Sequence, residues 1–147
     1  MRSGITIAAR VEELKAARAF IEKACAAAGA LDRDAFDLKL AVDEACTNII
    51  QHGYGGRGDG VIELACEIDT NTLRVTLVDR GRAFSPRDLP ETDTTSGWAE
   101  RPIGGLGWHF IRSSVDAIDY RADPVNGNRL TLVKRLAVPQ TKEKEIG

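Results

Sequence analysis

The sequence has little net charge and no long apolar run, and each shortage excludes a class of protein. Its 147 residues carry a formal net charge of -2, so neither a nucleic acid nor an anionic membrane is indicated as an obligatory partner. No apolar stretch approaches the roughly 20 residues that cross a bilayer, and the opening MRSGITIAAR lacks the apolar core of a signal peptide. We therefore expect a cytoplasmic protein.

Cysteine is also scarce, and its spacing excludes disulfide scaffolds and zinc sites. Cys25, Cys46 and Cys66 stand in apolar patterns, with no CxxC pair and no histidine at metal-ligand spacing. We expect reduced core residues. The chain has no internal repeat and no low-complexity tract, and its length suits one domain. We expect that domain to span residues 1–147, with its core over about 8–136 and a polar tail over 137–147.

The periodicity of the apolar residues predicts three helices and five strands. Helical spacing predicts three helices, over residues 11–28, 32–52 and 106–115. Gly29 ends the first of these, and Asp32 is expected to cap the second. Period-two alternation predicts strands over residues 5–9, 62–68, 73–78, 117–122 and 130–136. This order favours an α/β (α+β) sandwich, in which helices pack on one face of a mostly antiparallel, mixed sheet.

Neither of two common glycine-based nucleotide motifs is supported by the sequence. Residues 53–58, GYGGRG, match the dinucleotide pattern GxGxxG. That fingerprint must follow a strand and open a helix, however, whereas here a helix precedes it and a strand follows. The P-loop pattern GxxxxGK[ST] does not occur anywhere in the sequence. The sequence therefore favours neither a Rossmann fold nor a P-loop NTPase.

An acid, an amide and an imidazole interrupt the apolar side of the second predicted helix, in the segment DEACTNIIQHGY. Glu44 and Asn48 are four residues apart, and Gln51 or His52 completes the next turn, so their side chains project from one helix face. By spacing alone, the commoner explanation is a solvated or capping row at the rim of the core. A functional explanation needs support from the rest of the chain.

Two further segments carry groups suited to a nucleotide. Asp79 ends a predicted strand, where a carboxylate can accept a hydrogen bond from an exocyclic amine, and Gly81 lets the backbone approach a flat ring. Gly104, Gly105 and Gly107 precede the third predicted helix, whose free amides and dipole favour a phosphate chain. Taken singly, these segments are also explained by a DxG turn and a glycine-rich hinge.

The three segments in this order form a joint pattern: E-x-x-x-N on a helix, DxGxA at a strand end, a long loop, and GGLG before a helix. The chain resembles the GHKL ATPase superfamily, which also contains sensor histidine kinases and type II topoisomerases. DEACTNIIQHGY, GGLGWHFIRSSVDAIDYR and NGNRLTLVKRL are most similar to the small anti-sigma-factor serine kinases of bacteria. The resemblance covers about residues 8–136 and implies a Bergerat-type ATP-binding fold with a mobile lid over 85–104.

The resemblance also implies a role for each residue at a matching position. Glu44 would be the general base for a protein serine hydroxyl, Asn48 would ligate Mg²⁺, and Asp79 would read the adenine amine. The other candidate nucleotide-binding residues are His52, Gly81, Ala83, Phe84, Gly104, Gly105, Leu106, Gly107, Trp108 and Asn128. Ala83 stands where the superfamily often has glycine, so the ring would be placed differently there. Arg101 is either a lid arginine or a solvated charge.

The expected function follows from these implied roles. It is an ATP-dependent serine kinase, with ATP and Mg²⁺ as cofactors, that phosphorylates a small anti-sigma-factor antagonist protein and sequesters a sigma factor in its other state. The expected partners are ATP or ADP, the antagonist and a sigma factor, and we expect a homodimer formed through the strand over 5–9. An alternative is a nucleotide-sensing binding module with little catalysis, against which Glu44 argues. A purely structural domain would make three ordered motifs a coincidence.

Overall fold

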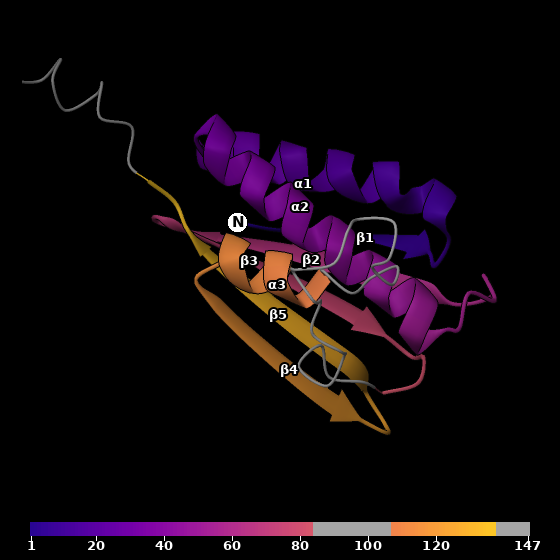
Figure 1. Ribbon diagram of the computed structural model, residues 1–147. Helices are drawn as coiled ribbons and strands as arrows, with labels where there is room; N and C mark the ends of the chain where they lie inside the picture. The colour runs from indigo at the N-terminus through magenta and orange to yellow at the C-terminus, as the bar shows by residue number, and fades with distance from the viewer. Residues whose placement is uncertain (84–106, 138–147) are drawn as a thin grey trace, which may run out of the picture.

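The computed structural model describes residues 1–83 and 107–137, in which helices cover one face of a five-stranded sheet (Figure 1). The strands are β1 (Arg2–Ala8), β2 (Val61–Asp69), β3 (Thr72–Asp79), β4 (Ala117–Asp123) and β5 (Gly127–Arg135). The helices are α1 (Leu14–Ala28), α2 (Asp32–Asn48) and α3 (Gly107–Ser114), with the 3₁₀ turn η1 (Val11–Glu13) before α1 and the π-helical turn η2 (Ile49–Gly53) after α2. These elements confirm the predicted α+β sandwich.

The strand order β1-β2-β3-β5-β4 places β5, the last of the described strands, inside the sheet. All four pairings are antiparallel, so the described strands include none of the parallel pairs that a mixed sheet would contain. Strand alternation directs one set of side chains toward the helices, and this set forms the core. Because β5 lies beside β3, Asp79 at the end of β3 pairs in register with Asn128 of β5.

Helix α1 packs through the apolar stripe that its spacing predicts. Its buried residues are Leu14, Ala17, Ile21, Ala24 and Cys25. The helix ends as expected at Gly29, which adopts the left-handed conformation with φ of 71°. The following amide, that of Ala30, donates to the carbonyl of Cys25 at 3.0 Å, so the last turn of the helix is closed by backbone hydrogen bonds.

Helix α2 begins at Asp32, but the prediction that Asp32 caps it is wrong. Leu31 occupies the cap position, and no side chain makes a capping hydrogen bond there. Asp34, in the first turn, is buried instead. It accepts a hydrogen bond from the amide of Ala137 at 3.0 Å and lies 3.9 Å from the ammonium of Lys134. A buried carboxylate requires such partners, so this acid joins α2 to the segment after β5.

All three cysteines are free and buried, which confirms that they belong to the core. Burial raises the pKa of the Cys25 thiol to about 11 and that of the Cys46 thiol to about 12. Since the thiolate is the reactive form, these side chains act as small apolar residues at neutral pH.

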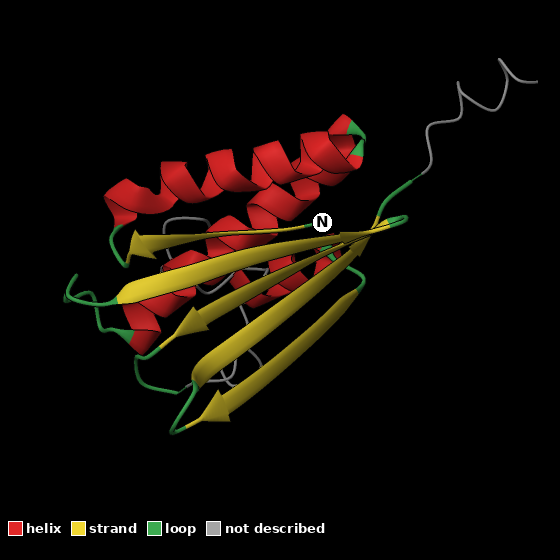
Figure 2. Ribbon diagram, turned by 180° about the vertical axis from the view of Figure 1, so that it is seen from behind, coloured by secondary structure: helices red, strands yellow, loops and turns green. Residues whose placement is uncertain are grey.

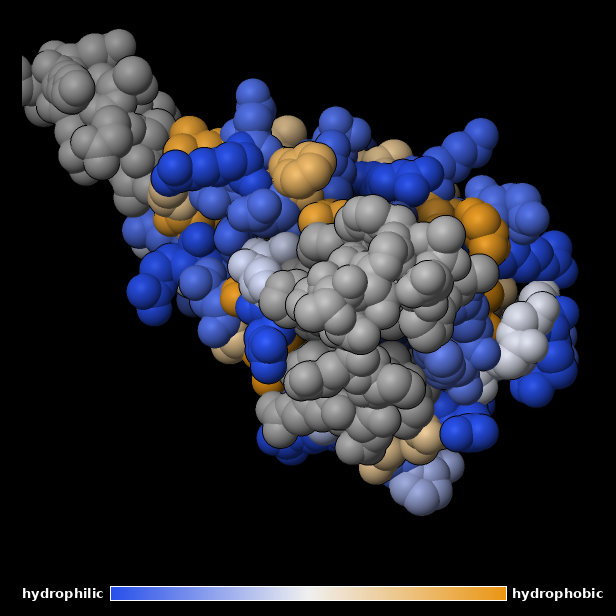
Figure 3. Space-filling view, in the orientation of Figure 1, coloured by the Kyte–Doolittle hydropathy of each residue, from blue (hydrophilic) through white to orange (hydrophobic). Residues whose placement is uncertain are grey.

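Where described residues are visible in Figure 3, the surface on the helix side is mainly hydrophilic, with separate hydrophobic patches. Among the described residues, the exposed large hydrophobic side chains are Met1, Val11, Phe36, Val61 and Val125. No helix in ranges 1–83 and 107–137 combines the length and the apolarity needed to cross a bilayer.

Candidate nucleotide-binding site

The polar row of the second helix lies where α2 passes into η2. Asn48 is the last residue of α2 and is 1% exposed. Both its Oδ1 and its Nδ2 are buried and, among the residues that the structure describes, neither has a hydrogen-bond partner. Such a group costs about 1–3 kcal/mol of stability, which points to a ligand that would satisfy it. Mg²⁺ prefers oxygen ligands and keeps several waters, so one amide oxygen fits the metal that the sequence implies.

Glu44 precedes Asn48 by four residues and is half-buried. Burial raises the pKa of its carboxyl group above the ordinary value, and the neighbouring carboxylate of Asp43 raises it further. A raised pKa brings a carboxylate closer to the range in which it exchanges protons near neutral pH. This environment suits a general base. His52 lies in η2, four residues beyond Asn48, and is also half-buried.

A second cluster forms around Asp79, which is 3% exposed at the end of β3. The amide of Gly81 donates to its Oδ1 at 2.9 Å, and Nδ2 of Asn128 donates to the same oxygen at 3.1 Å. Burial raises the pKa of the Asp79 carboxyl group, and these two hydrogen bonds lower it in part. Within the described ranges no hydrogen bond reaches Oδ2. The cluster therefore holds the carboxylate by one oxygen.

The loop after β3 packs directly on the end of η2. A Cβ at Gly81 would lie 2.5 Å from the carbonyl carbon and oxygen of Gly53, so no side chain fits there. The amide of Arg82 donates to the same carbonyl of Gly53 at 2.6 Å. Through this contact the fold brings the segment that carries Asn48 to the segment that carries Asp79.

Tyr54 fastens the same junction, and the sequence analysis did not single it out. Its hydroxyl is buried, donates to the carbonyl of Val61 at 2.7 Å and accepts the amide hydrogen of Arg80 at 2.8 Å. One hydroxyl group thus joins the end of η2 to β2 and to the residue after Asp79. A Cβ at Gly60 would overlap the Tyr54 ring. Both hydrogen-bond partners become neighbours only in the folded sheet, so the sequence pattern carried no signal for them.

We expect Tyr54→Phe to lower both the stability of the fold and its affinity for ATP. The substitution keeps the buried ring but leaves the Val61 carbonyl and the Arg80 amide without partners, which costs about 1–3 kcal/mol. Urea unfolding measures the loss of stability, and calorimetric titration with ATP measures the loss of affinity. An unchanged ATP affinity in a destabilised variant would contradict a role in positioning the site.

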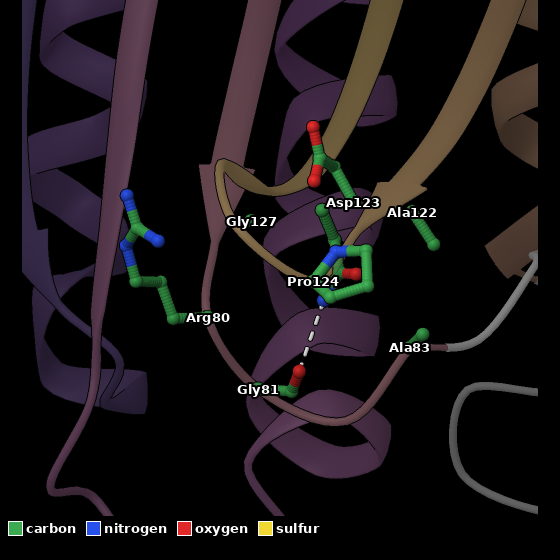
Figure 4. Close-up of a pocket in the computed structure, with 8 residues that line it drawn as sticks. Arg80, Gly81, Ala83, Ala122, Asp123, Pro124 and Gly127 are labelled. Atoms are coloured by element: carbon green, nitrogen blue, oxygen red, sulfur yellow. Dashed lines mark hydrogen bonds between the residues drawn. The ribbon is translucent and has the colours of Figure 1, made fainter.

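A pocket of about 320 Å³ opens beside the Asp79 cluster (Figure 4). Three of the predicted nucleotide-binding residues line it, namely Gly81, Ala83 and Asn128. The lining residues that the sequence analysis missed are Arg80, Ala122, Asp123, Pro124 and Gly127. Four of these five lie at one end of the β4–β5 hairpin, since Ala122 and Asp123 end β4, Pro124 is in the turn and Gly127 begins β5. This end forms one wall of the pocket because β5 pairs with β3. Figure 4 shows the hydrogen bond that reaches the carbonyl of Gly81, formed by Nδ2 of Asn128 at 3.0 Å. Glu44, Asn48 and His52 do not line this pocket.

Several candidates fall outside the described residues. These are Phe84, Gly104, Gly105 and Leu106, together with Arg101 and the predicted lid over 85–104. Gly107 and Trp108 begin α3, of which the structure gives the backbone at these positions. Helix α3 packs against α2 and buries Ile111 and Ser114. Its start at Gly107 lies one residue from the start predicted at 106.

The arrangement of these elements is that of a known family. Residues 7–134 match the model of the histidine kinase-like ATPase domain. The chain belongs to this family. It is 30% identical over 100 residues to an anti-sigma F factor of Clostridium novyi, and the alignment covers 68% of this chain and 70% of that protein. It is 31% identical over 93 residues to the serine-protein kinase RsbW of Bacillus pumilus, with 59% of this chain and 57% of that protein covered.

A solved structure shows the same fold. The crystal structure of the RsbU and RsbW domains of Rv1364c from Mycobacterium tuberculosis superposes with a TM-score of 0.68 at 22% identity. The superposition covers 95% of this chain and 33% of that chain. This superposition confirms the fold expected from the sequence. The match to the domain model confirms the expected superfamily, and ATP is the nucleotide that this domain family binds.

Proposed function

We propose that the protein is an ATP-dependent serine kinase that also acts as an anti-sigma factor. The observation that carries the proposal is the buried amide of Asn48, which has no hydrogen-bond partner among the described residues and lies four residues after the half-buried carboxylate of Glu44. The backbone contact between Gly53 and Gly81 links this pair to the Asp79 cluster. The relatives named anti-sigma F factor and serine-protein kinase support the same function.

The Asp79 cluster is proposed to bind the adenine base. Oδ1 of Asp79 is held by Gly81 and Asn128, which leaves Oδ2 to accept a hydrogen bond from the exocyclic amine. The backbone at Gly81 and the side chain of Ala83 provide a surface for the ring. In this role Asn128 orients Asp79 and also lines the pocket.

The α2 residues are proposed to act on the phosphates. Oδ1 of Asn48 would hold Mg²⁺, and the bound ion neutralises charge on the phosphate chain. Glu44 accepts the proton of the incoming serine hydroxyl, so that the oxygen can bond to the γ-phosphorus while the bond to the ADP oxygen breaks. His52 would lie near the phosphate end. The glycine-rich segment over 104–107 with Trp108 would contact the phosphates from the lid side.

The proposed partners are a small antagonist protein, which supplies the serine, and a sigma factor bound in the alternate state. We also propose a cytoplasmic homodimer of one domain, with its core over about residues 8–136. Strand β1 supports this dimer because it is one of the two edge strands of the described sheet, and an edge strand offers backbone groups for pairing with another chain.

Transfer of labelled phosphate tests the kinase directly. The purified protein, immobilised and incubated with γ-labelled ATP, is exposed to the cytosolic proteins of its source, and the retained proteins are analysed by mass spectrometry. We expect phosphoserine on one small retained protein, and about 10²-fold less or lower still with the Glu44→Gln variant. A retained protein without phosphoserine would contradict the kinase and favour a nucleotide-sensing binding module.

A further inference from the structure

The β4–β5 hairpin lies at the edge of the described sheet opposite β1, and the turn that joins its strands lies at the end of the sheet (Figure 2). The last residues that pair between β4 and β5 are Asp123 and Gly127. Residues 124–126 are therefore a turn outside the strand ladders. Pro124 of this turn lines the pocket of about 320 Å³, as do both paired residues beside it. The position of the turn therefore sets one wall of the pocket.

Hydrogen bonds to Asp123 give this turn its shape. The carboxylate accepts the amide hydrogen of Val125 at 2.8 Å and a hydrogen from the side chain of Asn126 at 2.7 Å. Hydrogen bonds from these two residues lower the pKa of the Asp123 carboxyl group, and the charge of Arg80 lowers it further. The bonds lie within the hairpin, so they do not join the turn to the rest of the sheet.

Arg80, the residue after β3, makes that connection. Its Nη1 donates to the carbonyl of Val125 at 2.9 Å. Among the described residues no other hydrogen bond joins residues 124–126 to a residue outside the hairpin. The side chain also packs beside Gly127, where an added Cβ would lie 3.6 Å from Cγ of Arg80 and 2.8 Å from the carbonyl oxygen of Asp79. Only a residue without a side chain fits between them.

The backbone of Arg80 is itself held in place. Its amide donates to the buried hydroxyl of Tyr54 at 2.8 Å, and it directly follows the buried Asp79. In Figure 4 the side chain of Arg80 extends away from Ala83 and Ala122, which lie on the other side of the pocket. Arg80 therefore links the turn to a fixed point beside the Asp79 cluster.

We propose that Arg80 is a positioning residue for the nucleotide, because its guanidinium group holds the turn that forms one wall of the pocket. This role rests on the proposed binding of adenine there. A wall that is held before the base enters has less conformational freedom to lose on binding, which favours affinity. Arg80 acts on the base through the wall, so it should affect adenosine and ATP alike. An attraction of its charge for the phosphates would affect ATP alone.

Calorimetric titration of the full chain with adenosine and with Mg-ATP tests this role. Arg80→Met keeps the apolar part of the side chain but removes the hydrogen-bond donors. We expect it to weaken the binding of both ligands by the same factor, about fivefold, the scale of one hydrogen bond. Arg74→Met is the matched control, because Arg74 is an exposed arginine of the same strand that does not line this pocket. It should change either affinity less than about twofold, as surface substitutions usually do.

Two further measurements separate positioning from a general loss of stability. In the phosphorylation assay, Arg80→Met should raise the KM for ATP by the same factor and leave kcat at the parental value. Asp123→Ala loosens the same turn from within, so the combined variant should lose less affinity than the product of the two single losses. Independent effects would multiply, and this would contradict a shared wall.

The outcomes also separate this proposal from that of the adenine site. If Arg80→Met weakens Mg-ATP but not adenosine, its charge acts on the phosphates and the positioning role is overturned. If Arg80→Met binds both ligands as tightly as the parent, this role alone is overturned and the adenine site stands. A parent that binds neither ligand would overturn both.

Discussion

Glu44→Gln is expected to lower serine phosphorylation by about 10²-fold or more, the scale of a lost general base, while the affinity for Mg-ATP stays within a few fold. The carboxylate acts on the incoming hydroxyl and touches the nucleotide only indirectly, so its loss affects the chemical step. A titration with labelled ATP measures the affinity, and a phosphoserine assay on the retained protein measures the rate.

Asp37→Asn is the control for that experiment. Asp37 is a half-buried acid of the same helix that lies 3.4 Å from Lys134, away from the candidate site, so its loss should leave phosphorylation near the parental rate. If Glu44→Gln itself phosphorylates at the parental rate, Glu44 is only a carboxylate at the rim of the core. The nucleotide-sensing module then becomes the better explanation.

The raised pKa of Glu44 adds a pH signature to the same prediction. Phosphorylation should fall as the pH drops through that pKa, because a protonated carboxyl group cannot accept a proton, and this fall should begin above the pH typical of a free glutamate. The folded state also holds this proton more tightly than the unfolded chain does. The contribution of Glu44 to stability is therefore present at low pH and is lost as the pH rises through the raised pKa.

Asn48→Leu is expected to stabilise the nucleotide-free protein and to abolish binding of Mg-ATP. The substitution replaces two buried polar atoms, which have no partner in the part of the chain that the structure describes, with methyl groups of similar volume, and this removes a penalty of about 1–3 kcal/mol. It also removes the oxygen proposed to hold the metal. Thermal unfolding with and without Mg-ATP measures both effects, because a ligand that binds the folded state raises its melting temperature.

Thr47→Val is the matched control in this case. Thr47 precedes Asn48 on α2, and its hydroxyl donates to the carbonyl of Asp43 at 2.8 Å, so it is a satisfied polar group. This variant should keep the shift that Mg-ATP produces. A destabilised Asn48→Leu that still shows the parental shift would mean that Asn48 is a core residue and that the metal is held elsewhere.

The sequence predicted the helices and strands well because each depends on the local spacing of apolar residues. Helix α1 and its end at Gly29, the β2 and β3 hairpin and the β4–β5 turn all lie close to their predicted positions. The cap of α2 was predicted wrongly, since an acid at a helix start has other uses. Asp34 shows one of them, because it binds the segment after β5.

The candidate site was less accessible to sequence reasoning because it depends on which strands become neighbours. Asp79 and Gly81 were predicted from a local motif. The pairing of β3 with β5, however, places Asn128 beside Asp79 and makes one end of the β4–β5 hairpin a wall of the pocket. The role of Tyr54 depends on its contacts with β2 and with the residue after β3, and no pattern in the sequence predicts the π-helical form of η2. These features arise from tertiary packing.

Calorimetric titration of the parent and of Asp79→Asn with Mg-ATP and Mg-GTP tests the central claim most directly, namely that the Asp79 cluster reads adenine. The carboxylate accepts a hydrogen bond from the adenine amine, whereas guanine presents a carbonyl oxygen at that position. We expect the parent to bind ATP about tenfold or more tightly than GTP, the value of one hydrogen bond to a charged group, and Asp79→Asn to lose most of that preference. Equal affinities for ATP and GTP in the parent would contradict the adenine site.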